Sequence, residues 1–254
     1  MSRPRAWLEM VGYLVIFLVQ AIRTTPHLVR RSPQLAAELR FVGTRSTLVI
    51  AISGGFIGMV VAVQFYDTLV RFGSVGLLGS AVGLALTREL APVVTALMVI
   101  ARVGSSMAAE LGIMRADHQI DALECMAINP FQLLVLPKLA AIIISLPILV
   151  ALFIVVGTFG GYAVGVLGLG LPSGVYLEAL YSAVHTQDLL MALVKALTFG
   201  LVCGWICIGK GFLIHRTASG LQGSAGVSKN TTEAVVAAAV ATLFVDYVLT
   251  AAMI

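Results

Sequence analysis

The sequence predicts an all-α integral membrane protein with five transmembrane helices. Of its 254 residues, 59% are hydrophobic and only 11% are charged, whereas charged residues make up about a quarter of a typical soluble domain. The chain also contains five apolar runs of the roughly 20 residues that a bilayer-spanning helix needs. We expect one membrane domain over residues 1–254, because this length leaves no room for a soluble enzyme domain beside it.

The five runs define a transmembrane core over residues 47–254. The second and third are longer than a span requires, so they must tilt, kink or extend past the hydrocarbon. Glycines four residues apart, Gly54 with Gly58 and Gly161 with Gly165, predict close approach of helix backbones. The runs are 47–66, 73–101, 139–167, 189–209 and 234–254.

Basic residues are distributed unequally between the two sides of these spans. Thirteen of the 16 Lys and Arg residues lie before the first run or in the second-to-third and fourth-to-fifth connections. The other side has only Arg71, while Arg88 and Lys195 fall within spans. Because short cytoplasmic connections carry the excess of basic residues, we expect a cytoplasmic N-terminus and a C-terminus on the outer side.

The segment 1–40 precedes the first span and contains a shorter apolar run. Glu9 and Gln20 interrupt that run, and no small-residue cleavage site follows it. We expect a helix that lies in the membrane interface, with Arg5, Glu9, Gln20 and Arg23 roughly along its polar side. A sixth span and a cleaved signal peptide are the alternatives.

A short amphipathic helix is expected on the cytoplasmic side, between the second and third spans. It covers 117–126, with Asp117 as its N-cap and Asn129-Pro130 ending the pattern. Asp117, Asp121 and Glu124 share one face, which anionic lipid headgroups would repel. We therefore expect a protein partner for this face; a solvated loop helix is the alternative.

Charges inside the spans mark a candidate site. Arg88 and Glu89 fall near the middle of the second run, where ionised groups survive only with a partner or a wet cavity. Neighbouring helix residues do not face each other, so each should look to another helix, a ligand or water. Pro92 cannot donate to the Arg88 carbonyl, which predicts a kink and a free carbonyl. We interpret this polar break as the lining of a cavity.

Two further charges lie in the outer parts of the fourth and fifth runs. Lys195 and Asp246 are geometrically able to form an ion pair. Intramembrane ionisable residues are expensive, and they serve either structure or function. Both readings stay open for this pair.

Several chemistries are excluded. No Gly-x-x-x-x-Gly-Lys-Ser/Thr sequence is present, so the chain has no P-loop for a nucleotide. Cys125, Cys203 and Cys207 lack metal-ligand spacing, and the latter two are expected to be small packing residues. With no Ser-His or metal-His arrangement in a span, we expect no catalytic residue and no metal. Nucleic acid is not expected as a partner, because the basic residues form no stripe.

Ordered motifs from about residue 42 to the C-terminus resemble those of the MlaE/YrbE permeases. The resemblance includes the charges that lie in or beside the spans, and its motifs are specific. The matching positions are 86–97, 101–112, 119–124, Asn129-Pro130, 145–147, Gly160-Gly161, Asp188 with Lys195, Gly226-Val227 with Thr231-Thr232, and Val245-Asp246.

This resemblance implies an ABC transporter permease of the bacterial inner membrane. It implies a homodimer with two cytoplasmic ATPase subunits, which would bind ATP and Mg. It also implies a periplasmic MCE-domain hexamer and often a STAS-domain protein as further partners. The implied cargo is phospholipid, exchanged between the two membranes to maintain outer-membrane lipid asymmetry. Arg88 and Glu89 would line the lipid cavity between two permeases.

The resemblance also implies that 117–126 is the coupling helix that enters the ATPase groove. Asp117, Gln119, Asp121 and Glu124 would be its coupling residues. His118 is a departure, since many relatives have Glu there, and it reduces the acidic face at neutral pH. Two alternatives to an ABC permease are a proton-coupled carrier of an amphipathic substrate, with Glu89 or Asp246 taking protons, and a non-transporting membrane scaffold.

Overall fold

The computed structural model describes residues 3–24, 32–214 and 224–253. These residues form helices and no strand. Within these described residues, five helical segments are long and apolar enough to cross a membrane, and each overlaps one predicted run, so the all-α fold with five candidate spans is confirmed. The segments are Pro33–Arg71, Val75–Ala116, Phe131–Gly168, Thr186–Phe212 and Ala225–Met253.

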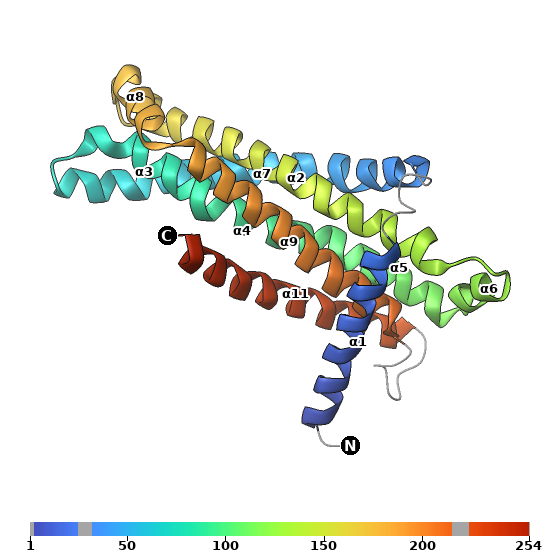
Figure 1. The fold of residues 1–254 in the computed structure, drawn as a ribbon. Coiled ribbons are helices and arrows are strands. Elements are labelled where there is room, and N and C mark those ends of the chain that lie inside the picture. Colours follow the sequence, from blue (N-terminus) through green and yellow to red (C-terminus); the bar gives the residue numbers. More distant parts are fainter. Residues whose placement is uncertain (1–2, 25–31, 215–223, 254) are drawn as a thin grey trace.

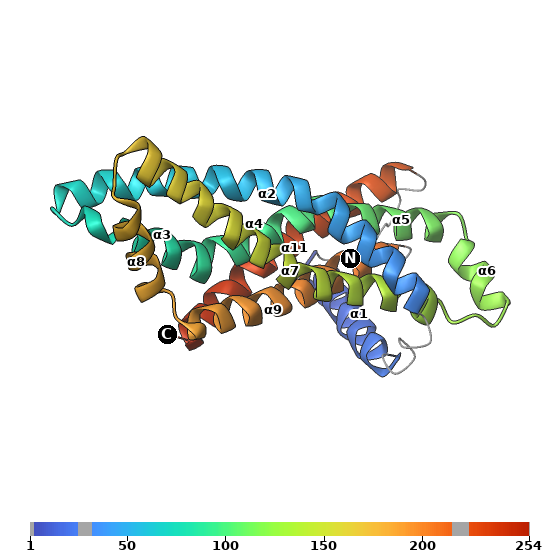
Figure 2. The same ribbon diagram turned by 90° about the horizontal axis from the view of Figure 1, so that it is seen from above.

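The long helices run side by side in one bundle (Figures 1 and 2). The helix α3 (Leu78–Ala85) and the short helix α8 (Ser173–Ala183) lie at one end of it. The helices α5 (Ser105–Ala116) and α6 (Gln119–Cys125) lie at the opposite end. This separation places the predicted outer connection and the predicted cytoplasmic helix at opposite ends of the bundle.

The first helix, α1 (Arg3–Thr24), crosses the bundle obliquely (Figure 1). Its apolar part, Gly12–Ala21, is shorter than a span. Leu14, Phe17 and Ala21 are buried in the core, while Gln20, on the predicted polar side, is exposed. The side chains of the other residues predicted for that side, Arg5, Glu9 and Arg23, lie outside the described part of the structure, so an interfacial position stays a prediction.

The second span is longer than its predicted run because α5 continues it to Ala116. The break expected near Pro92 is present as a π-helical turn, Leu86–Leu90, immediately before α4 (Ala91–Val99). Such wide turns inside helices occur frequently at functional sites. The structure thus confirms a local irregularity at the polar break.

The predicted start of the cytoplasmic helix is wrong. Asp117 ends α5, with its N–H donating to the carbonyl of Ile113 at 2.9 Å. His118 then adopts a left-handed conformation, with φ 58°, and α6 begins at Gln119. A left-handed residue breaks the helix, and histidine enters this region more readily than most residues. The helix also ends at Cys125, before Asn129 and Pro130.

Glycines allow the first and third spans to approach closely. α2 (Ser32–Arg71) packs along α7 (Leu136–Tyr162), and a side chain at Gly58 would collide with the backbone of Gly157. Gly54 also faces α7, where a side chain would come within 3.2 Å of the backbone oxygen of Phe153, a tight contact but no collision. The predicted close approach at Gly54 and Gly58 is confirmed, with α7 as the partner.

The second glycine pair makes room for an aromatic ring on α8, a helix that the sequence analysis did not predict. Tyr176 of α8 is fully buried, and a side chain at Gly161 would meet its hydroxyl. The Tyr162 ring lies edge-on to it, with centroids 5.7 Å apart. Burial raises the pKa of Tyr176 to about 12, so the phenol stays protonated at physiological pH.

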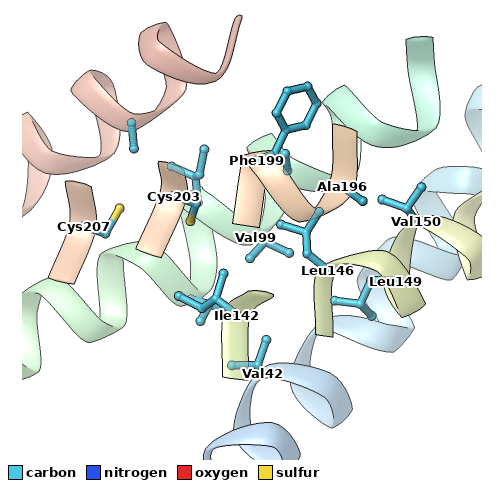
Figure 3. Packing of buried hydrophobic residues seen from close by; sticks show 14 of the residues in the cluster. Val42, Val99, Ile142, Leu146, Leu149, Val150, Ala196, Phe199, Cys203 and Cys207 are labelled. Atoms are coloured by element: carbon cyan, nitrogen blue, oxygen red, sulfur yellow. The ribbon is translucent and has the colours of Figure 1, made fainter. Parts of the chain in front are cut away.

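The core is centred on α9 (Thr186–Phe212), which contacts α5, α7 and α11 (Ser224–Met253). Figure 3 shows α9 side chains such as Phe199 beside apolar residues from neighbouring helices. Cys203 and Cys207 are buried and face Gly104, which confirms them as packing residues. Because α9 also carries Asp188 and Lys195, its packing fixes the position of the candidate site.

Candidate functional site

Five charged side chains from three spans form one group, which we call the charged cluster: Arg88, Glu89, Asp188, Lys195 and Asp246. Asp188 and Lys195 are two turns apart, and so share one face of α9. Asp246 and Thr250 are one turn apart on α11 and likewise share a face. Arg88 and Glu89 lie in the π-helical turn of the second span.

Lys195 is the centre of the charged cluster, and its side chain is 0% exposed. Its Nζ lies 2.7 Å from Glu89 Oε2 and 2.9 Å from Asp246 Oδ1. It also donates to Thr250 Oγ1 at 2.7 Å. The predicted Lys195–Asp246 pair is confirmed, and the structure adds Glu89 and Thr250 to it.

The predicted free carbonyl has a partner. Pro92 has no N–H to donate to the Arg88 carbonyl, and Lys195 Nζ donates to that oxygen at 3.0 Å. Pro92 itself is buried. Its contribution to the charged cluster is therefore indirect, through the carbonyl that it leaves open to Lys195.

Arg88, like Glu89, pairs with a residue of another helix, as predicted, and its partner on α9 is Asp188 instead of Lys195. Its Nε lies 2.7 Å from Asp188 Oδ1, and the Asp188 side chain is only 6% exposed. Asp188 Oδ2 accepts the His185 N–H at 2.9 Å, which completes a capping box at the start of α9. The Arg88 side chain is 45% exposed, and its two terminal nitrogens have no partner among the described residues. Asp188 thus orients a guanidinium whose outer edge is open.

A pocket of about 480 Å³ lies against that open edge. Arg88, Asp188 and Gln187 supply its polar wall, while Leu190, Met191 and Met253 supply an apolar one. A guanidinium edge of this kind binds phosphate or carboxylate oxygens. The pocket can therefore accept an anionic group attached to an apolar body. In the described part of the chain, no group of His, Cys, Asp or Glu could hold a metal ion.

At the opposite end of the bundle, α6 does not present a free acidic face. Arg115 Nη1 lies 2.9 Å from Asp121 Oδ1 and 3.7 Å from Glu124 Oε1. His118 Nδ1 lies 2.8 Å from Asp121 Oδ2. Asp117 belongs to the end of α5, so the structure does not bring all three predicted acids onto one helix. Gln119 is exposed at the start of α6.

Arg115 joins α6 to the end of α9 and was missed by the sequence analysis. Its guanidinium lies 5.6 Å from the centroid of the Phe212 ring, a cation–π arrangement. The Phe212 ring is in turn 5.0 Å from Phe131, the first residue of the third span, and 5.9 Å from Phe17 of α1. Helical spacing gives no signal for this contact, because Arg115 and Asp121 lie on opposite sides of the left-handed turn.

A second buried lysine was also missed. Lys138 Nζ lies 2.8 Å from both Glu38 Oε1 and Glu110 Oε2. These residues belong to α7, α2 and α5, so the lysine joins three spans. Lys138 was predicted to be a connection charge, but α7 begins at Leu136 and includes it.

Comparison with known proteins gives a consistent result. A family model described as "Permease MlaE" matches residues 35–252. The chain is 37% identical over 244 residues to the intermembrane phospholipid transport system permease protein MlaE of Haemophilus influenzae, covering 96% of this chain and 91% of that protein. It is also 37% identical to a probable ABC transporter permease protein of Rickettsia bellii, covering 95% of this chain and 91% of the relative. These matches include all five long helices.

Proposed function

The chain belongs to the MlaE permease family, and on this basis we propose that it is the membrane-spanning subunit of an ABC transporter that moves phospholipid. The observation that carries the proposal is the half-exposed Arg88 beside a pocket with an apolar wall. Such a pocket suits a phosphate attached to acyl chains. The phospholipid would pass between the inner membrane and a periplasmic MCE-domain partner, which would maintain outer-membrane lipid asymmetry.

The proposed partners rest on the relatives, which include a probable ABC transporter permease protein. Because this chain has no P-loop of its own, we propose two cytoplasmic ABC ATPase subunits that bind ATP and Mg. We further propose that this chain is a single domain and that two copies of it form a homodimer. The homodimer would assemble with an MCE-domain hexamer and, in some systems, with a STAS-domain protein. Arg88 and Glu89 would line the lipid cavity between the copies. In the inner membrane, α1 would lie in the interface and α6 would be the cytoplasmic coupling helix.

Reconstitution tests the function. The purified homodimer with its ATPase should carry bound phospholipid and should transfer labelled phospholipid to its periplasmic partner only when ATP is hydrolysed. Transfer driven by a proton gradient without ATP would support a secondary carrier instead. Full transfer by a variant in which Arg88 and Glu89 are both apolar would support a scaffold, since a scaffold has no need of these charges.

The basic-residue distribution predicts the orientation of the spans, with α6 in the cytoplasm and α8 outside. A Ser173→Cys variant should therefore react with a membrane-impermeant thiol reagent in intact spheroplasts, whereas Ala116→Cys should not. Both substitutions are made in a Cys125→Ala background, because Cys125 is exposed on α6 while Cys203 and Cys207 are buried. After permeabilisation Ala116→Cys should react as well. The reverse labelling pattern would overturn the orientation.

We propose that α6 docks on the ATPase through Gln119, Asp121 and Glu124, with Asp117 beside them at the end of α5. Reversing Asp121 and Glu124 to Lys is expected to release the ATPase or to uncouple hydrolysis from transport, because the contact would then meet charges of the wrong sign. Membrane insertion should be normal. Co-purification of the ATPase and stimulated hydrolysis are the measurements.

The Arg115→Ala variant is the matched control. It removes the internal partner that both carboxylates share, leaves His118 beside Asp121, and leaves both negative charges available to the ATPase. If it binds the ATPase normally while the double reversal does not, the carboxylates contact the ATPase directly. Wild-type co-purification and hydrolysis in the double reversal would refute the assignment.

A further inference from the structure

A second cavity lies beside the pocket at Arg88, in a groove between α7 and α9. It measures about 280 Å³, and Pro147, Val150 and Ile154 line its α7 side. Leu189, Leu190 and Leu193 line its α9 side, and Thr186 is the only polar residue in the lining. The groove is therefore suited to a hydrocarbon chain and to no polar ligand.

The shape of the groove has a local cause in the sequence. Ala151 and Ala192 contribute small side chains to its lining, between larger neighbours. Pro147 lies inside α7 and cannot donate to the carbonyl of Ile143, which favours a bend there. Leu189 and Leu190 are about half exposed, at 49% and 54%, so this wall of the groove is open at the surface of the bundle.

The groove and the pocket adjoin at the first turns of α9. Leu190 lines both of them. Thr186 of the groove and Gln187 of the pocket are consecutive residues in the first turn of α9. The pocket thus presents the open guanidinium edge of Arg88, and the adjoining groove presents apolar side chains apart from Thr186.

We propose that the groove between α7 and α9 holds an acyl chain of the phospholipid whose phosphate contacts Arg88. This inference rests on the proposed function and adds a place for the chain and a lateral entrance from the bilayer. Charge complementarity selects the occupant, because a ligand that reaches both cavities must join an anionic group to a hydrocarbon chain. A bilayer lipid that merely borders the groove would have no link to Arg88, and this difference provides the test.

The test uses a phospholipid with a photoactivatable group in one acyl chain, added to the homodimer and its ATPase in nanodiscs. Cross-linked peptides are located by mass spectrometry. Labelling of 147–154 and 189–193 should exceed labelling of the exposed α11 residues Val236 and Val240. Arg88→Ala should lower groove labelling about tenfold, the loss expected for a hydrogen bond to a charged group. Labelling on α11 should not change.

Leu190→Trp tests the junction between the two cavities, because the larger ring would fill it. It should lower groove labelling, whereas Leu197→Trp, at an exposed position of α9 outside the groove, should not. Equal groove labelling in wild type and Arg88→Ala, or equal effects of the two tryptophans, would overturn the inference. If Arg88→Ala loses bound phospholipid but keeps groove labelling, the role of the groove is refuted and the proposed function is not. A wild-type dimer without bound phospholipid would refute the proposed function itself.

Discussion

Replacing Lys195 with methionine is expected to destabilise the permease by about 3–5 kcal/mol, the usual cost of removing one partner from a buried ion pair. Methionine keeps the unbranched shape and most of the length of the side chain and removes its charge. The charged cluster has two cations and three carboxylates, so the variant leaves Glu89 and Asp246 facing each other without a cation between them. The measurement is the thermal unfolding midpoint of the purified protein, together with its yield.

Lys138→Met provides a matched control at the other end of the bundle. This lysine is also buried between two carboxylates, so its loss should lower the midpoint too, without touching the pocket at Arg88. A triple variant, Lys195→Met with Glu89→Gln and Asp246→Asn, should recover much of the lost stability, because it removes the unpaired charges as well. An unchanged midpoint in Lys195→Met would show that the group is not a stabilising ion network.

The spans could be predicted because hydropathy and length act locally along the chain. The pair between Lys195 and Asp246 was also predictable, since both charges occur at similar depth in consecutive spans. The contacts of Arg88 and Glu89 with Asp188 and Lys195 were not, because those partners lie about 100 positions along the chain. Helical periodicity assigns a residue to a face of its own helix, but it does not identify the helix that packs there.

The errors concern short elements, for which local signals compete. Asp117 has the residue type of an N-cap, yet it caps the C-terminal end of α5, which continues to Ala116. The left-handed residue between α5 and α6 is therefore His118. The helix α8 has 11 residues, too few for a span, and was taken as part of a connection. Lys138 was assigned to a connection because the predicted third run begins at residue 139, and the acids beside it, Glu38 and Glu110, come from other helices that only the fold brings to it.

Substitution of Arg88 should separate phospholipid binding from stability. If the guanidinium contacts phosphate, bound phospholipid per assembled dimer should fall least in Arg88→Lys and most in Arg88→Ala. Lysine keeps the charge but loses the planar fork that holds two oxygens, and alanine loses both. The open edge of Arg88 and the adjoining pocket give the physical reason for this order. The measurement is phospholipid extracted from size-selected dimers.

Asp188→Asn provides the control for orientation. It keeps Arg88 intact but removes the carboxylate that holds Nε at 2.7 Å, so bound phospholipid should fall less than in Arg88→Ala. If Arg88 were only a structural partner, Arg88→Ala would leave Asp188 unpaired at a buried position and would lower mainly yield and thermal stability. In that case the phospholipid content of the surviving dimers would equal that of wild type, and Arg88 would be removed from the substrate site. The amount of phospholipid per folded dimer separates a phosphate-binding role of Arg88 from a purely structural one, because unfolded protein is not counted.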